Sequence, residues 1–253
     1  MQRQWLFTDM GMDVQRRQMI IGGAALAALP IVATAAEPGR NDAQMKDDWP
    51  WVSRYADDNT RMLESGQKVD VVFMGDSITE GWKRLRPDFF PLSWINRGIG
   101  GQTSPQMVLR MASDVVALKP RLVHILAGTN DVAGNTGPMT DAMTLANIRA
   151  MIAIAKDARI KVVVGAIPPA SKFFWNPAAT PRDAIIRRNA LLLRLVREKH
   201  VGWIDYHALL DDGTGGLDKR YGGDGVHPNG VGYEAMEKAA LPVIRKYLGK
   251  TRG

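Results

Sequence analysis

The 253-residue sequence contains no cysteine. Disulfide bonds, thiolate catalysis and cysteine metal sites are therefore excluded. The absence does not argue against export, because a domain of this length can fold without covalent cross-links. Apolar residues make up 45% of the chain and charged residues 23%, which is ordinary for a soluble globular protein. We expect one α/β domain and exclude disorder throughout.

Blocks of like charge are also absent. The 33 Lys and Arg residues outnumber the 26 Asp and Glu residues, which gives a net charge of +7, but they are scattered along the chain. A basic balance can attract nucleic acid, anionic lipid or acidic polysaccharide. The sequence has neither zinc-finger spacing nor an aromatic RNA-binding signature. We therefore interpret the charge as solvated surface and expect no nucleic acid partner.

The apolar run at residues 19–32 is shorter than the ~20 residues that a membrane-spanning helix needs, and Pro30 interrupts it. Arg16 and Arg17 precede the run, and Ala-Thr-Ala at residues 33–35 follows it. A positive flank, a short apolar core and small residues, in that order, are typical of a secretory signal. We predict that residues 1–35 are a signal peptide, that the protein is periplasmic or secreted, and that no stable membrane insertion remains after cleavage.

The paired arginines are also typical of a twin-arginine signal. Gln15, Met19 and Ile21 depart from that motif, so the export route stays open. An uncleaved membrane anchor and a buried helix of the fold are the alternatives for this segment. Polar residues 36–51 are predicted to link it to a domain at residues 52–250.

Short apolar runs rich in β-branched residues predict the strands of this domain. The clearest spans residues 69–74 and stops at Gly75. Similar runs occur at residues 93–96, 122–127, 161–167 and 202–204, and helical patterns at residues 52–65, 104–118, 141–157, 181–199 and 230–248. Strands that alternate with helices predict a five-stranded parallel sheet in a three-layer α/β/α domain.

Ligands of open parallel sheets bind beyond the carboxyl ends of the strands. Three polar segments follow predicted strands at one edge of the sheet: Gly-Asp-Ser-Ile-Thr at 75–79, Asn-Arg-Gly-Ile-Gly-Gly at 96–101 and Gly-Thr-Asn-Asp at 128–131. A fourth, Asp-Gly-Val-His at 224–227, precedes the last predicted helix, and all four lie in predicted loops. Taken singly, each is more often a turn or a polar loop. Their joint occurrence, in this order, indicates a site.

Ester hydrolysis requires a nucleophile, a base and a group that orients the base. Ser77 can be the nucleophile and His227 its base, with Asp224 fixing the imidazole tautomer. The developing oxyanion requires N–H donors. The backbone N–H groups of Ser77 and Gly101 and the side-chain amide of Asn130 are the candidates. Gly100 is the alternative to Gly101, because the double glycine leaves the alignment ambiguous by one residue.

The same four segments resemble the sequence blocks of SGNH (GDSL-type) hydrolases over residues 69–232, with Ile78 in place of leucine. Their spacing is similar to that of the subgroup of platelet-activating factor acetylhydrolase catalytic subunits and bacterial lysophospholipase-like esterases. The resemblance implies a flavodoxin-like fold, with the four namesake residues at Ser77, Gly101, Asn130 and His227. The Gly-x-Ser-x-Gly motif of α/β-hydrolases is absent.

Aromatic residues near these segments are candidates for the substrate pocket. Phe173, Phe174 and Trp175 follow the fourth predicted strand, and Trp82 follows the nucleophile candidate. The alternative is that these side chains only pack against the domain. No His-Glu-x-x-His and no calcium-loop pattern is present, so we expect no metal site.

We expect an ester hydrolase that forms an acyl-enzyme and needs no cofactor. Its partner is a small-molecule or carbohydrate ester, and short acyl groups, acetyl above all, are favoured for an exported protein that meets acetylated polysaccharide. Lysophospholipid, aryl ester and thioester substrates are the alternatives. A non-catalytic carbohydrate-binding module and a flavodoxin-like nucleotide or flavin binder stay open on the same fold, because a fold alone does not fix function.

Overall fold

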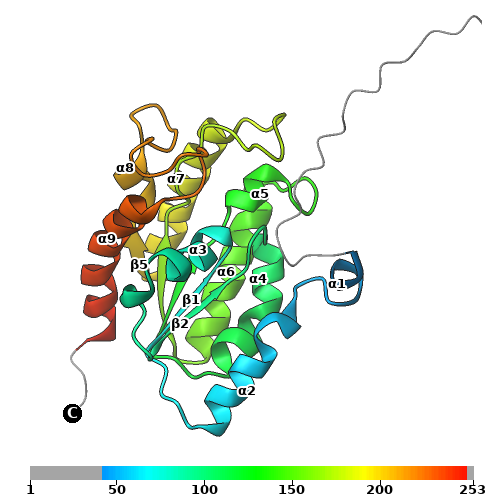
Figure 1. Ribbon diagram of the computed structural model, residues 1–253, viewed down its shortest axis with the longest axis vertical. Coiled ribbons are helices and arrows are strands. Elements are labelled where there is room, and N and C mark those ends of the chain that lie inside the picture. Colours follow the sequence, from blue (N-terminus) through cyan, green and yellow to red (C-terminus); the bar gives the residue numbers. More distant parts are fainter. Residues whose placement is uncertain (1–41, 250–253) are drawn as a thin grey trace, which may run out of the picture. The chain divides into compact units, whose positions relative to one another are not determined.

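A computed structural model describes residues 42–249 of the chain (Figure 1). Five strands form one sheet in the order β2-β1-β3-β4-β5, and every neighbouring pair is parallel. The strands are β1 (Val71–Gly75), β2 (Trp94–Gly98), β3 (Leu122–Leu126), β4 (Lys161–Gly165) and β5 (Gly202–Ile204). The predicted five-stranded parallel sheet is confirmed.

Helices cover both faces of the sheet, which confirms the three-layer architecture. One face packs against α2 (Ala56–Glu64), α4 (Ser104–Met111), α6 (Asp141–Asp157) and α7 (Pro181–Lys199), and the other against α3 (Ser77–Leu85), α8 (Tyr206–Leu210) and α9 (Gly230–Leu248). The remaining elements are α1 (Asp42–Asp47), η1 (Val52–Tyr55), η2 (Pro87–Phe89), the π-helical turn η3 (Ala112–Val116) and α5 (Thr129–Ala133).

Alternating side chains of the strands supply two separate cores. In β1, Val72 and Met74 join the core on the α4 and α6 side, whereas Val71 and Phe73 join the core under α3 and α9. This is the alternation expected of a strand, and both sets are apolar because both faces are covered. Every residue of β1 is buried.

The structure differs from the sequence prediction at two of the polar segments. Ser77 and Asn130 do not lie in loops: each lies in the first turn of a helix, α3 or α5 respectively. Both helices are short, with nine and five residues. Short helices give little periodic signal, and tertiary packing rather than propensity stabilises them.

The segment expected to be a linker is partly described. Residues 42–47 form α1, and the chain after it is attached to the domain. Gln102 Nε2 donates to the Pro50 carbonyl at 2.6 Å and Gln106 Nε2 to the Trp49 carbonyl at 2.8 Å. The predicted signal peptide, residues 1–35, lies outside the described residues, as do residues 36–41 of the predicted linker.

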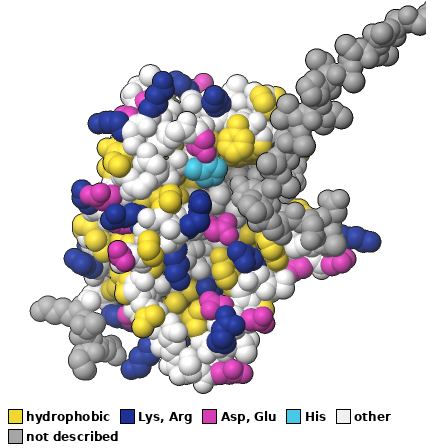
Figure 2. Space-filling model, in the orientation of Figure 1, with side chains coloured by type: hydrophobic (Ala, Val, Ile, Leu, Met, Phe, Trp, Pro, Cys, Tyr) yellow, Lys and Arg dark blue, Asp and Glu magenta, His cyan; other side chains and the backbone are white. Residues whose placement is uncertain are grey.

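The described surface carries mixed charges. On the face shown in Figure 2, Lys and Arg side chains alternate with acidic and apolar ones and form no continuous basic patch. Within residues 42–249, no helix combines the length and apolarity that a membrane crossing requires.

Candidate active site

Ser77 is the first residue of α3, which begins where β1 ends. The Asp76 carboxylate caps this helix by accepting the Ile78 N–H at 2.9 Å, as N-cap aspartates commonly do. Gly98 of β2 lets that strand approach α3 closely, because a Cβ there would lie 2.2 Å from the backbone nitrogen of Glu80. Ser77 therefore lies at the carboxyl end of β1, in the first turn of a helix packed closely against β2.

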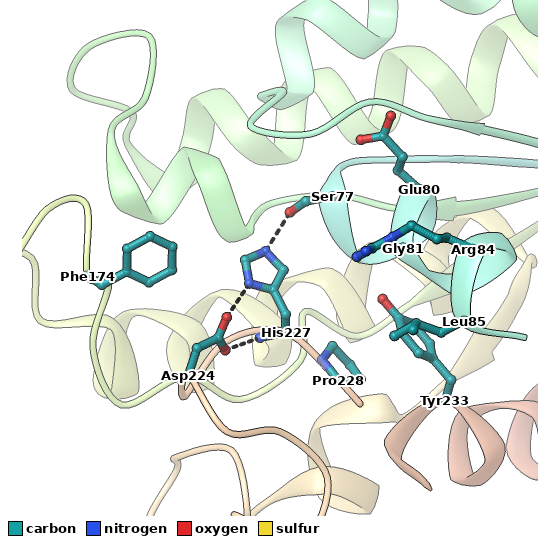
Figure 3. A pocket seen from close by; sticks show the side chains of 10 residues that line it. All are labelled: Ser77, Glu80, Gly81, Arg84, Leu85, Phe174, Asp224, His227, Pro228 and Tyr233. Atoms are coloured by element: carbon teal, nitrogen blue, oxygen red, sulfur yellow. Dashed lines mark hydrogen bonds and ion pairs between the residues drawn. The ribbon is translucent and has the colours of Figure 1, made fainter. Parts of the chain in front are cut away.

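His227 lies between Ser77 and Asp224 (Figure 3). Its Nε2 is 2.9 Å from Ser77 Oγ, and its Nδ1 is 2.7 Å from Asp224 Oδ2. The other oxygen of Asp224 accepts the backbone N–H groups of Val226 and His227, each at 2.8 Å. The structure thus brings together the hydroxyl, the imidazole and the carboxylate singled out in the sequence. In this arrangement Asp224 accepts a hydrogen bond from Nδ1–H, so the lone pair of the imidazole is on Nε2, where it can take the proton of Ser77.

The pKa values of the two aspartates near Ser77 are shifted in opposite directions. Burial alone would raise the pKa of Asp224, but the hydrogen bonds from the ring and backbone of His227 and from the Val226 N–H outweigh it and lower the pKa to about 2. Complete burial raises the pKa of Asp76 to about 7, although the Ile78 N–H and the nearby His227 act against this shift. Asp224 therefore stays ionised at neutral pH, whereas Asp76 does not stay fully ionised.

The three oxyanion donors predicted from the sequence differ in their hydrogen bonding. Asn130 is buried and donates one Nδ2 proton to the Gln102 carbonyl at 3.0 Å, which leaves a second proton on the same nitrogen. Within residues 42–249, neither the backbone N–H of Ser77 nor that of Gly101 donates to another protein group. Asn135 joins two of these groups, because its Nδ2 donates to Asn130 Oδ1 at 2.9 Å and to the Gly101 carbonyl at 3.1 Å.

The two glycines of the second segment differ in their bonding. The Gly100 N–H donates to Glu80 Oε2 at 2.8 Å and is therefore engaged. Gly101 has a φ of 67°, a left-handed conformation that glycine adopts without steric cost. Of these two backbone N–H groups, that of Gly101 has no acceptor among residues 42–249.

A pocket of about 550 Å³ opens beside Ser77 and His227 (Figure 3). Its lining includes three charged side chains, those of Glu80, Arg84 and Asp224, and one exposed aromatic ring, Phe174. The remaining lining residues are Ser77, Gly81, Leu85, His227, Pro228 and Tyr233. The pocket therefore combines charged side chains with apolar ones, among them Leu85, Pro228 and Phe174.

Two of the four aromatic residues expected in the pocket are buried elsewhere. Trp82 is 0% exposed and stacks on Phe89, at 5.0 Å between ring centroids, within the core under α3. Phe173 is also 0% exposed and belongs to the opposite core. Phe174 lines the pocket, and the Trp175 ring lies 6.3 Å from that of His227.

Helical geometry explains the error at Trp82. It follows Ser77 by five residues, and at about 100° per residue its side chain is rotated by about 140° from that of Ser77. The pocket residues of α3 are Glu80, Gly81, Arg84 and Leu85, which follow Ser77 at the spacings that share one helix face. Sequence reasoning missed these four residues because it treated the segment after Asp76 as a loop.

Comparisons with known proteins agree with this geometry. The GDSL-like Lipase/Acylhydrolase family matches residues 73–235. A GDSL-like lipase from Bacteroides thetaiotaomicron of known structure is 38% identical, with a TM-score of 0.74, covering 79% of this chain and 99% of that one. Human platelet-activating factor acetylhydrolase IB subunit alpha2 is 27% identical over 217 residues, which is 79% of this chain and 86% of that protein.

A more distant structure shares the fold alone. The acetylxylan esterase Axe2 from Geobacillus stearothermophilus is 20% identical, with a TM-score of 0.55, covering 73% of this chain and 97% of that one. The family match spans more than half of the sequence and contains all the residues of the Ser-His-Asp arrangement. The chain belongs to the GDSL-like lipase/acylhydrolase family and is a carboxylic ester hydrolase.

Proposed function

We propose that the protein removes acetyl groups from carbohydrate esters through an acyl-enzyme on Ser77. The Ser77 Oγ attacks the ester carbonyl carbon, and its proton passes to His227 Nε2. Asp224 accepts from Nδ1 and stabilises the imidazolium that forms. The observation that carries this proposal is the chain of two hydrogen bonds that joins Ser77 to Asp224 through His227. Ser77 Oγ is 2.9 Å from His227 Nε2, and His227 Nδ1 is 2.7 Å from Asp224 Oδ2.

The tetrahedral oxyanion accepts hydrogen bonds from the N–H groups of Ser77 and Gly101 and from Asn130 Nδ2. Donors of this kind act on charge that develops only in the transition state, so they raise the rate rather than tighten substrate binding. Collapse of the intermediate expels the alcohol, which takes the proton from His227. Water then attacks the acyl-enzyme with His227 as base, and acetate leaves as Ser77 recovers its proton.

The lining of the pocket favours a short acyl group. A long acyl chain that lay against Glu80, Arg84 or Asp224 would remove these charges from water without a partner, which is costly. An acetyl group needs only the space next to Ser77. Phe174, which is 59% exposed at the rim, offers an apolar face on which a sugar ring can pack.

The substrate class is tested by comparing two product assays with the same enzyme. Acetate release from acetylated xylan is measured beside fatty-acid release from lysophosphatidylcholine, each for wild type and Ser77→Ala. We expect acetate release that is lost in Ser77→Ala, and fatty-acid release at least 10-fold slower per enzyme. Faster release of fatty acid would replace the carbohydrate acetate with a lipid substrate.

A fluorophosphonate probe tests the nucleophile without any choice of substrate. We expect labelling of wild type and none of Ser77→Ala. Equal labelling of both proteins would remove Ser77 from its role, and absence of labelling in wild type would favour a non-catalytic binding module.

We also propose that the protein acts outside the cytoplasm, because the first 35 residues have the composition of an export signal. Cell fractionation together with N-terminal sequencing of the mature protein tests this proposal. Full-length protein confined to the cytoplasm would contradict it.

A further inference from the structure

The turn that carries Gly101 is held by the segment at the N-terminal side of the domain. The Tyr55 hydroxyl donates to the Gly98 carbonyl, and Gln102 Nε2 donates to the Pro50 carbonyl. Both ends of the Gly98–Gln102 turn are therefore anchored to the segment before α2. Between these anchors lies the Gly100–Gly101 pair.

Glu80 holds the middle of the same turn. One of its carboxylate oxygens, Oε2, accepts the Gly100 N–H at 2.8 Å. The other, Oε1, accepts from Arg54 Nη2 at 3.3 Å. Glu80 follows Ser77 by three residues on α3, so it lies about one helical turn from the nucleophile on the same helix face.

This contact restrains the turn at its most flexible point. The peptide group that carries the Gly101 N–H directly follows the Gly100 residue, and two successive glycines have wide freedom in φ and ψ. A rotation of that peptide group would turn the N–H away from the carbonyl of a bound ester. Pinning the Gly100 N–H to the helix of the nucleophile restricts this rotation.

We propose that Glu80 is a positioning residue for the oxyanion hole, and that Arg54 keeps its carboxylate in place. The inference rests on the proposed acyl-enzyme mechanism. Loss of one oxyanion donor typically lowers kcat by about 10²–10³-fold. A donor that is present but less well oriented is expected to cost about 10-fold or more.

The solvent exposure of the Arg54–Glu80 ion pair distinguishes a role in positioning the turn from a role in overall stability. The side chains of Arg54 and Glu80 are 42% and 37% exposed, and ion pairs at such positions contribute little to stability. Glu80→Ala should therefore leave the protein folded and its unfolding temperature nearly unchanged. A large effect on turnover would then come from the geometry of the turn.

The test compares Glu80→Ala with Glu80→Gln and with Glu198→Ala. Glu198 forms an exposed ion pair with Arg149 and is a matched control for the loss of a surface carboxylate. With 4-nitrophenyl acetate we expect kcat of Glu80→Ala to fall at least 10-fold with KM within about two-fold. Glu80→Gln should recover most of kcat, because its amide oxygen can still accept the Gly100 N–H. Glu198→Ala should match wild type.

Hydrogen–deuterium exchange of the peptide that covers residues 98–102 provides a readout that needs no substrate. We expect faster exchange in Glu80→Ala than in Glu80→Gln or wild type. Unchanged exchange would show that the contact does not hold the turn, and faster exchange with an unchanged kcat would show that the turn does not limit catalysis. Either result overturns the inference, whereas a wild-type protein that hydrolyses no ester and resists the fluorophosphonate probe would overturn the proposed function itself.

Discussion

The hydroxyl of Ser77 and the Nε2 atom of His227 are 2.9 Å apart, although 150 residues separate them in the sequence. Ser77 begins α3 and His227 lies just before α9, and both helices pack against the same face of the sheet. Tyr233 connects the two helices directly, because its hydroxyl donates to the Ile78 carbonyl at 2.8 Å. The relay between the two side chains therefore depends on the packing of α9 against α3.

Replacing Asp224 by asparagine should impair catalysis without unfolding the protein. The amide cannot hold the imidazole tautomer whose Nε2 carries the lone pair that accepts the Ser77 proton, and we expect kcat to fall by about 10²–10⁴-fold. Because the pKa of Asp224 is about 2, its carboxylate is ionised throughout pH 5–9. The loss in kcat should thus have a similar size across that range, measured as pH profiles of both proteins. A deficit that vanishes at high pH would contradict the assigned role.

Removing the hydroxyl of Tyr233 should loosen the contact between α9 and α3. Tyr233→Phe keeps the ring but removes the hydroxyl that donates to the Ile78 carbonyl. We expect the free energy of unfolding to fall by about 1 kcal/mol. Urea unfolding measures it, with Tyr247→Phe on the last turn of the same helix as a control. Because the ring still lines the pocket, kcat/KM should stay within a few-fold of wild type. Equal stability of wild type and Tyr233→Phe would argue that the contact contributes nothing.

Truncation of the buried Trp82 should lower stability, whereas truncation of the exposed Phe174 should change substrate binding. Trp82→Ala removes a ring that is 0% exposed and should destabilise the protein by about 3–5 kcal/mol. Thermal unfolding measures this loss, and Leu92→Ala, at a side chain that is 89% exposed, is the control. A small effect at Trp82 would be incompatible with its place in the core.

Phe174→Ala should change substrate binding instead. We expect stability within about 0.5 kcal/mol of wild type, because the ring is mostly exposed. KM for acetylated xylan should rise several-fold while KM for 4-nitrophenyl acetate stays nearly constant. If KM rises for both substrates, Phe174 contacts the acyl group or His227 rather than the sugar.

The buried Asp76 should make stability depend on pH. Its folded pKa of about 7 lies above the value of about 3.9 in an unfolded chain. Between these values the folded state holds a proton that the unfolded state has lost, so the contribution of Asp76 to stability is fully present below about pH 4 and is lost as pH rises to about 7. The slope is at most about 1.4 kcal/mol per pH unit.

Asp76→Asn removes this titration and keeps a side chain that caps helices well. Urea unfolding at pH 4.5 and pH 7.5 measures the free energy of unfolding of both proteins. The value for wild type minus the value for Asp76→Asn should be smaller at pH 7.5 than at pH 4.5. Asp88→Asn, at an exposed position in η2, controls for the loss of one negative charge. A difference between wild type and Asp76→Asn that is the same at both pH values would rule out the raised pKa.

The sequence predicts the sheet well because buried parallel strands have a strong signature. Residues 71–75 form an uninterrupted apolar run, and no helical period competes with it. The triad candidates could be found for a similar reason, since the chemistry needs these residue types and the topology fixes where they stand. The helix that follows Asp76 escaped prediction because nine residues show little periodicity.

The contact between Glu80 and Gly100 could not be predicted from the sequence. It depends on the register that pairs Gly75 of β1 with Gly98 of β2, and on the close approach of α3 that Gly98 permits. Neither the register nor the approach is visible in the local pattern of residues. The exposure of Phe174 and the burial of Phe173 depend in the same way on how the connection after β4 folds back onto the domain.

That connection, residues 166–180, has a consequence for how the specificity of this enzyme could be changed. It contributes Phe174 to the rim but none of the residues of the Ser-His-Asp relay, so a chimera carrying another loop there could accept a different alcohol with its acyl chemistry intact. One constraint applies to such a graft. Trp175 Nε1 donates to Asn135 Oδ1 at 2.9 Å, and the Asn135 amide in turn contacts Asn130 and Gly101. A transplanted loop would need to bring its own donor to that amide.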